Sequence, residues 1–445
     1  MAETIAAAPA GRPRAWWRTR GTLGELLSGR ANGFGLIRLL LALSVVVSHS
    51  NPVGYGRLDV GSQLFGNQVD LGKMAVVGFF AISGFMITGS GKRLGVGRYA
   101  WHRALRILPA LWVCIVLTAF VLAPVLYHGQ HGSLAGFWTA KYGPFQYIEG
   151  MWNTSIGSGY DISGIMTTGI HRHTNFNGAF DGALWSLKYE IFCYVIVGIL
   201  AAGGVLTRAR RTVALVTVGL WIMILMNLID AKGWRGAPSE GSTAWNMPIL
   251  GWLSSHYVIY LGFVFLLGAT FQLYKERVPI NDLLAVGAFA ALVGSLLLGG
   301  FFVIGYPAFA YLVIWGGVRM PKKLHWVGRK NDYSYGIYIY GFPVLQTLLM
   351  YHFTKYGHYA YVLAAIAITW ALAWLSWHLV EDRAMSLRHW TPAPLQRWLT
   401  ARQAVRQAAR EKAALAEGAA APAATAASGT ASESASAVSA GAGKQ

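Results

Sequence analysis

Long apolar runs recur along the whole chain, and they restrict its fold more than any other feature. A helix needs roughly 20 mostly apolar residues to cross the ~30 Å hydrocarbon layer of a bilayer. Backbone polar groups cannot stay unpaired in lipid, so such runs form helices or barrel strands, and barrel strands alternate in hydropathy over about ten residues. These runs do not alternate, so we predict an all-α, polytopic transmembrane bundle of about ten helices. The expected spans are 33–50, 72–91, 107–127, 184–204, 212–229, 256–274, 282–299, 300–318, 333–351 and 359–380.

The distribution of positive charge supports this topology. Only 12% of the residues are charged, against about 25% in soluble proteins, yet the formal net charge is +19. If the amino terminus is cytoplasmic and the sides alternate through ten helices, 28 of the 37 Lys and Arg residues are cytoplasmic and 7 lie outside, with Arg38 and Lys188 inside spans. This is the positive-inside pattern, with both termini cytoplasmic. Topology therefore explains the basic charge, and no nucleic-acid partner is expected.

The two cysteines, Cys114 and Cys193, each lie inside a predicted span. Their positions and spacing indicate neither a structural disulfide nor a zinc site, so no metal is expected. The first apolar run follows about 30 polar and basic residues and has no small-residue cleavage site. It is expected to be retained as the first helix.

The chain divides by composition into four parts. Residues 1–32 form a basic cytoplasmic tail, and 33–380 form the membrane domain. Within that domain the long outer loop 128–183 is rich in aromatic residues and glycine, which favours a packed cap. Residues 381–412 are basic and contain an amphipathic stretch suited to the inner leaflet. Residues 413–445 are rich in Ala and Ser and are expected to be disordered.

Two ionisable side chains share one face of the first predicted helix. Arg38 and His49 are 11 residues apart, which is three turns plus about 20°, so they point the same way about 16 Å apart along the axis. Ionisable groups within a span usually mark function. The alternative is that Arg38 reaches the inner interface and His49 ends the helix without a chemical role.

Glu190 is the carboxylate of the fourth span and lies about 9 Å inside it. Lys188 is close in sequence, but residues two apart on a helix do not face each other. A carboxylate that orients an imidazole is the usual support of a histidine general base, so we predict that Glu190 supports His49. The alternative is a structural ion pair with an arginine.

An inner loop and the second helix add further candidates. Arg103 and Arg106 are three residues apart at a helix start and can converge on one anion, since the planar guanidinium suits phosphate. Taken alone, they also fit the positive-inside pattern. Ser83 and Gly84 in the second helix allow another backbone to come close, which is also the ordinary signature of helix packing.

Six sequence blocks follow one another in a fixed order over about residues 33–380: Arg38-X10-His49, GFFAISGFMI, WHRALRILP, GALWSLKYEIFCY, VGRKNDYSYGIYIYGFPV and WHLVEDRAM. In this order they resemble the acyltransferase-3 family of bacterial membrane acyltransferases. Two residues depart from its pattern: Gly341 stands where many members have His, and Asp181 stands where many have Asn before the Gly-X-Leu-Trp block.

The resemblance implies transfer of an acyl group, most often acetyl, from coenzyme A to a sugar of a surface or secreted glycan. It implies His49 as the base with Arg38 as its partner, and Arg103 and Arg106 on the nucleotide end of the donor. Acetyl-CoA would be a substrate, with no permanently bound cofactor, and the location would be the bacterial inner membrane.

Several roles and alternatives remain open at this stage. Ser83 is assigned beside the donor, and Trp185 and Asp181 beside the acceptor. Direct attack on the thioester and a route through acetyl-His49 both fit, as do acetyl and succinyl groups. The main rival function is a glycan-lipid transporter or flippase without acyl chemistry, and a second is a non-catalytic scaffold. Oligomeric state is not readable from the sequence.

Overall fold

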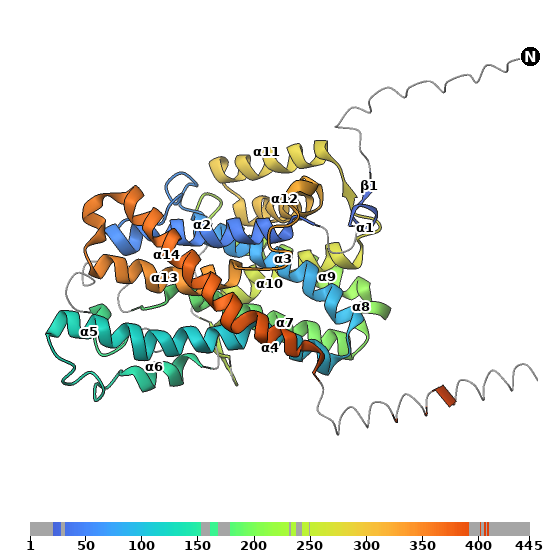
Figure 1. Cartoon of the computed structure of the whole chain (residues 1–445). Helices are drawn as coiled ribbons and strands as arrows, with labels where there is room; N and C mark the ends of the chain where they lie inside the picture. The colour runs from blue at the N-terminus through green and yellow to red at the C-terminus, as the bar shows by residue number, and fades with distance from the viewer. Residues whose placement is uncertain are drawn as a thin grey trace, which may run out of the picture. The chain divides into compact units, whose positions relative to one another are not determined.

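The computed structural model describes residues 21–27, 32–152, 161–167, 179–230, 233–236, 243–248 and 250–390, with four single positions between 401 and 408. A helix occupies each of the ten predicted spans, so the predicted all-α membrane bundle is confirmed (Figure 1). The spans correspond to α2 (Phe34–Tyr55), α3 (Leu71–Arg93), α4 (Val96–Leu117) with η2 (Thr118–Leu122) and α5 (Ala123–His131), α7 (Leu187–Ala202), α9 (Arg210–Asp230), α10 (Ser255–Leu273), α11 (Asp282–Leu298), η6 (Phe301–Gly305) with α12 (Tyr306–Arg319), α13 (Ser334–Met350), and α14 (His358–Ser376) with η9 (Trp377–Glu381).

Within the described residues, eight of these helical segments are long and apolar enough to cross a membrane. The other two, α11 and α13, have 17 residues each. Short helices connect or extend the bundle: α1 (Leu23–Leu26), α6 (Pro144–Met151), η3 (Ile165–Thr167), η5 (Gly182–Ser186), α8 (Val205–Arg208), η7 (Lys322–Leu324), η8 (Phe353–Tyr356), α15 (Asp382–Ser386) and η10 (Leu387–His389).

Two small ribbons of strands accompany the helices. Strand β1 (Gly21–Thr22) pairs antiparallel with β4 (Pro279–Ile280), and β2 (Ala244–Met247) pairs antiparallel with β3 (Gly251–Ser254). The first ribbon joins the segment before α2 to the loop between α10 and α11. Those two segments therefore lie at the same end of the bundle, as the predicted topology requires.

Close backbone contact between α3 and α10 forms the centre of the bundle. A Cβ added at Gly84 would lie 1.9 Å from the Phe265 carbonyl oxygen, and one added at Gly268 would lie 2.2 Å from that of Ala81. Small residues allow membrane helices to approach in this way. The helix-packing reading of Gly84 is therefore the one that the structure supports.

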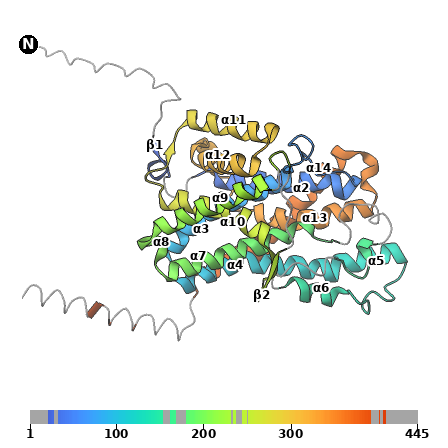
Figure 2. The same cartoon turned by 180° about the vertical axis from the view of Figure 1, so that it is seen from behind.

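The third helical run, Val96–His131, has 36 residues and is about 54 Å long, well beyond the ~30 Å hydrocarbon layer. Its α5 end therefore extends past the membrane, and α6 packs against η2 and α4 with Tyr147 and Met151 buried (Figures 1 and 2). The end of α5 and all of α6 belong to the described part of the predicted outer loop 128–183. Residues 153–160 and 168–178 of that loop lie outside the described residues.

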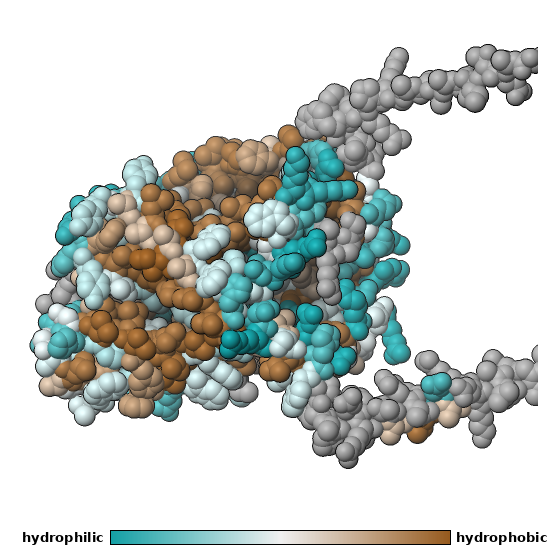
Figure 3. Space-filling model, in the orientation of Figure 1, coloured by the Kyte–Doolittle hydropathy of each residue, from teal (hydrophilic) through white to brown (hydrophobic). Residues whose placement is uncertain are grey.

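Hydropathy separates the two ends of the bundle from its middle. On the face shown in Figure 3, apolar side chains cover much of the middle of the bundle and a band of hydrophilic side chains covers one end. We call the end that carries the loops 92–95, 203–209, 275–281 and 320–333 the basic end, and the opposite end the His49 end. Of the predicted segments 1–32, 381–412 and 413–445, the following residues lie outside the described ones: 1–20, 28–31, 391–400, 402–404, 406 and 409–445.

Candidate active site

His49 lies near the end of α2 and contacts a carboxylate from the loop that follows. Its Nδ1 is 3.0 Å from Oδ1 of Asp59, which also accepts a 3.1 Å hydrogen bond from the hydroxyl of Ser48. The His49 and Asp59 side chains are 13% and 21% exposed, and the edge of the imidazole meets the ring of Phe342. The pair therefore forms a mostly buried imidazole–carboxylate dyad at the opening of the bundle.

A cavity of about 400 Å³ opens beside this dyad. Its walls come from α2, α3, η5, α7, α10, α13 and the 56–70 loop, so it sits where six helices and one loop converge. Trp185 forms part of the wall and packs on Tyr257, with ring centroids 4.5 Å apart. Lys188 lines the same cavity, and its ammonium donates to the carbonyl oxygen of Trp252 at 2.8 Å. We call this space the acceptor cavity.

A second acid, Asp70, lies in the acceptor cavity and caps α3. Its Oδ1 accepts a 2.7 Å hydrogen bond from the backbone N–H of Lys73. Burial raises the pKa of the Asp70 carboxyl, and the nearby Asp59 carboxylate raises it further. Two acids therefore line one cavity: the Asp59 carboxylate contacts His49, and the Asp70 carboxylate caps the first turn of α3.

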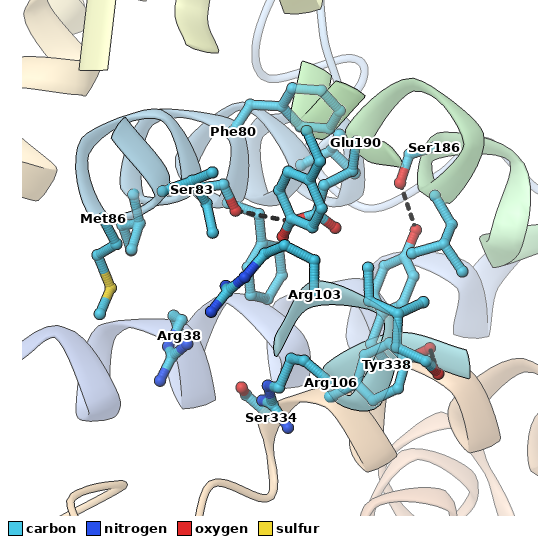
Figure 4. Close-up of a pocket in the computed structure, with 18 residues that line it drawn as sticks. Arg38, Phe80, Ser83, Met86, Arg103, Arg106, Ser186, Glu190, Ser334 and Tyr338 are labelled. Carbon is cyan, nitrogen blue, oxygen red and sulfur yellow. Dashed lines mark hydrogen bonds between the residues drawn. The ribbon is translucent and has the colours of Figure 1, made fainter. Parts of the chain in front are cut away.

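Glu190 does not contact His49, contrary to the sequence-based prediction. Its Oε1 accepts two hydrogen bonds of 2.6 Å, from the hydroxyl of Ser83 and from the phenol of Tyr194. Glu190 lies on the side of α7 that faces α3 and α4, and it lines a different cavity, of about 120 Å³ (Figure 4). Gly72, near the start of α3, lies against Ser48 beside His49, whereas Glu190 bonds to Ser83, 11 residues further along α3. Glu190 is therefore displaced from His49 along the bundle toward Arg103 and Arg38.

Arg38 and Arg106 meet on one carboxylate at the basic end. Asp332 Oδ2 lies 2.7 Å from Nη2 of Arg38 and 2.5 Å from Nη2 of Arg106, and Arg106 Nη1 reaches Oε2 of Glu381 at 2.8 Å. Burial alone would raise the pKa of the Asp332 carboxyl, but the two guanidinium groups hold it below its usual range. This network ties α2, α4, α13 and η9 together.

The network changes the expected role of Arg106. Both of its terminal nitrogens already contact carboxylates, and its guanidinium also stacks on Tyr335 and Trp377. Arg103 differs, because the described residues provide it with no ion pair and only the ring of Tyr194, 5.9 Å away. Of the two predicted donor-binding arginines, Arg103 is therefore the one available for an anionic ligand.

Arg38, Arg103 and Arg106 all line the 120 Å³ cavity, which we call the donor cavity. In Figure 4 the Arg103 side chain lies between Ser83 and Glu190 on one side and Arg38 and Arg106 on the other. Val76 and Tyr338 line both the donor and the acceptor cavity. The two cavities therefore share a wall, with Arg38 of α2 in one cavity and His49 of the same helix in the other.

Tyr338 closes this shared wall in a fixed position. Its phenol donates to the Ala183 carbonyl oxygen and lies 2.7 Å from the hydroxyl of Ser186. Asp181, which we predicted to contact the acceptor, is instead 1% exposed and is not among the residues that line the acceptor cavity. Among the described residues neither carboxylate oxygen has a hydrogen-bond partner of normal geometry. Burial raises the pKa of the Asp181 carboxyl well above its usual range, against a smaller lowering by the nearby backbone N–H of Ala183.

Residues 32–380 match the family model described as an acyltransferase domain. The chain belongs to this acyltransferase family. The chain is 27% identical over 368 residues to a protein of Shigella phage Sf6 named O-acetyl transferase, covering 80% of this chain and 97% of that protein. It is 28% identical over 398 residues to Nodulation protein 10 of Rhizobium leguminosarum bv. viciae, covering 83% of this chain and 97% of that protein. No solved structure matches the chain.

Family membership confirms the resemblance read from the six blocks. The candidate site contains residues that the sequence analysis did not single out. Asp59 and Asp332 are the two carboxylates that contact His49 and Arg38. Both lie in loops, where helical periodicity carries no information. The sequence feature that could have pointed to them is the small number of acids: the chain has 18 Asp and Glu residues, so each acid near a span is a candidate partner for a buried cation.

Proposed function

We propose that this acyltransferase moves an acetyl group from acetyl-CoA to a sugar hydroxyl of a surface or secreted glycan. The observation that carries the proposal is the shared wall between an arginine-lined cavity and a cavity that contains an imidazole–carboxylate dyad. The name O-acetyl transferase of the phage relative supports acetyl as the group transferred.

Charge sets the direction of the reaction in this proposal. The basic end would face the cytoplasm, because loops rich in Lys and Arg stay on that side of the bacterial inner membrane. Acetyl-CoA would enter the donor cavity from there, with its phosphates toward Arg103. The His49 end would face outward, where glycans are modified. Arg38 and His49 are about 16 Å apart along α2, a distance suited to the flexible arm of coenzyme A.

The dyad supplies the base. With a proton on Nδ1 shared with Asp59, the Nε2 lone pair of His49 accepts the proton of the acceptor hydroxyl. The hydroxyl oxygen forms a bond to the thioester carbonyl carbon, the carbon–sulfur bond breaks, and the coenzyme A thiolate leaves with the electron pair. His49 then releases the proton to that thiolate, and the Asp59 carboxylate stabilises the transient imidazolium.

The acceptor cavity suits a sugar. Trp185 and Tyr257 present an aromatic wall, and Lys188 and Asp70 present polar groups beside it. In this arrangement the acceptor hydroxyl approaches His49 from the outer side while the acetyl group reaches it past Val76 and Tyr338. Ser83 and Glu190 then belong to the donor side and not to the base.

The test uses sealed membrane vesicles of both orientations that contain wild-type protein, His49→Ala or the control His128→Ala, whose side chain is exposed on α5. We expect label from acetyl-CoA to reach host polysaccharide in wild type and control, only when donor is on the basic side and acceptor on the other. Loss of transfer in His49→Ala alone supports the proposal. Equal transfer in all three proteins removes His49 from the chemistry, and glycan transport without label transfer favours the flippase.

A further inference from the structure

A third cavity, of about 620 Å³, lies at the basic end outside the acyl-transfer path. One wall is apolar and comes from Leu36 and Leu39 of α2 and Trp370 of α14. The other wall is the 326–333 loop, which contains Trp326, Arg329, Lys330 and Tyr333. We call this space the α2–α14 groove.

Within the described residues, no acid neutralises the two exposed basic side chains of the groove. Arg329 and Lys330 are exposed, and the described part of the chain offers neither of them an ion pair. The one acid in the groove, Asp332, is already bound by Arg38 and Arg106. An anionic group at this loop would therefore meet two available cations.

The groove lies where the protein meets the bilayer interface. In Figure 3 the apolar belt meets the hydrophilic band on the face where α14 runs in front. Trp326 is 73% and Trp370 is 37% exposed, and both line the groove. Exposed Trp side chains next to basic residues are typical of the level of lipid headgroups, and basic pockets between helices on the cytoplasmic side bind anionic headgroups.

We propose that the α2–α14 groove binds one anionic phospholipid of the inner leaflet, with its phosphate on Arg329 and Lys330 and an acyl chain along Leu36, Leu39 and Trp370. The nucleotide of the donor is a weaker candidate for this place. Arg38 faces the donor cavity, whereas Leu36 lies about 160° around α2 from it, and the Arg38–Asp332–Arg106 bridge stands between the two spaces.

The experiment is a lipid titration of the full chain in a neutral detergent, with bound lipid counted by native mass spectrometry. The probes are dioleoylphosphatidylglycerol and, as the neutral comparison, dioleoylphosphatidylcholine. The test variant is the double substitution Arg329→Gln/Lys330→Gln. The matched control is Lys322→Gln/Lys323→Gln, which removes the same charge from η7 in the same inter-helix segment but outside the groove.

We expect wild type and control to bind phosphatidylglycerol equally and the test variant to bind it about 30-fold more weakly, given the usual contribution of two basic side chains near anionic lipid. Phosphatidylcholine binding should be weak in all three. An equal loss of phosphatidylglycerol binding in both double variants would show that binding depends on diffuse charge attraction, and it would overturn the proposed site. Displacement of phosphatidylglycerol by coenzyme A would overturn it in favour of a nucleotide site.

Discussion

Replacing Asp59 by Asn tests the dyad, because it removes the charge and keeps the size of the side chain. Asp59 Oδ1 is 3.0 Å from Nδ1 of His49, and both side chains are mostly buried. At an effective dielectric of about 20, full unit charges at that distance interact by about 5.5 kcal/mol. In a transition state with the proton half transferred, the carboxylate stabilises the developing imidazolium by roughly half of this energy, about 2.7 kcal/mol. Loss of that stabilisation in Asp59→Asn should lower kcat about 100-fold.

The assay is initial-rate transfer of labelled acetyl from acetyl-CoA to host polysaccharide in membranes with equal protein content. The matched control is Glu149→Gln, the same chemical change at an exposed acid of α6. If Asp59 acts through His49, the double variant Asp59→Asn/His49→Ala will be no slower than His49→Ala alone, because residues of one catalytic unit are not additive. Retention of more than half of the wild-type kcat by Asp59→Asn would refute the argument.

Three further outcomes follow from the structure. Arg103→Gln should raise KM for acetyl-CoA about tenfold with little change in kcat, since a charge-assisted contact to phosphate contributes about 1.5–3 kcal/mol. The control Arg98→Gln, at an exposed position, should leave KM unchanged. A KM of Arg103→Gln equal to that of wild type would exclude Arg103 from donor binding. Gly84→Ala should lower the free energy of unfolding by about 1–3 kcal/mol through overpacking against α10. The control Gly97→Ala, which has open space around it, should leave this free energy unchanged. Equal unfolding midpoints of the two variants, measured by calorimetry in detergent, would contradict this prediction. Burial raises the pKa of Asp181, so above about pH 4 the unfolded chain releases this proton while the folded chain keeps it, and wild type loses stability as pH rises. The Tm of Asp181→Asn minus that of wild type should therefore increase from about pH 5 to about pH 8. A constant difference would show that the carboxyl group is ionised in the folded protein.

The site as a whole separates two tasks that the sequence analysis had joined. One acid, Asp59, orients the imidazole, and another, Asp332, holds the two arginines of the basic end. Glu190 belongs to neither pair and instead fixes Ser83 and Tyr194 on the donor side. Charge-neutralising substitutions of these three acids should therefore affect different steps.

The sequence alone determined the helices, their order and which of them carry ionisable groups. Lipid is the reason, because a run of about 20 apolar residues has one conformation that satisfies its backbone in hydrocarbon. The same periodicity placed Arg38 and His49 on one face of α2, and both line cavities that share a wall. Ordered blocks gave the family, which the match over residues 32–380 confirms.

Only the tertiary structure decided which charged group meets which. Hydropathy identifies a span but gives neither the rotation nor the offset of its helix against its neighbours, so Glu190 lines the cavity of Arg38 and Arg103 and not that of His49. Asp59 and Asp332 lie in loops whose course depends on how α2, α3 and α13 pack. Their contacts join residues through space, and long-range packing, which no local pattern encodes, sets the distances.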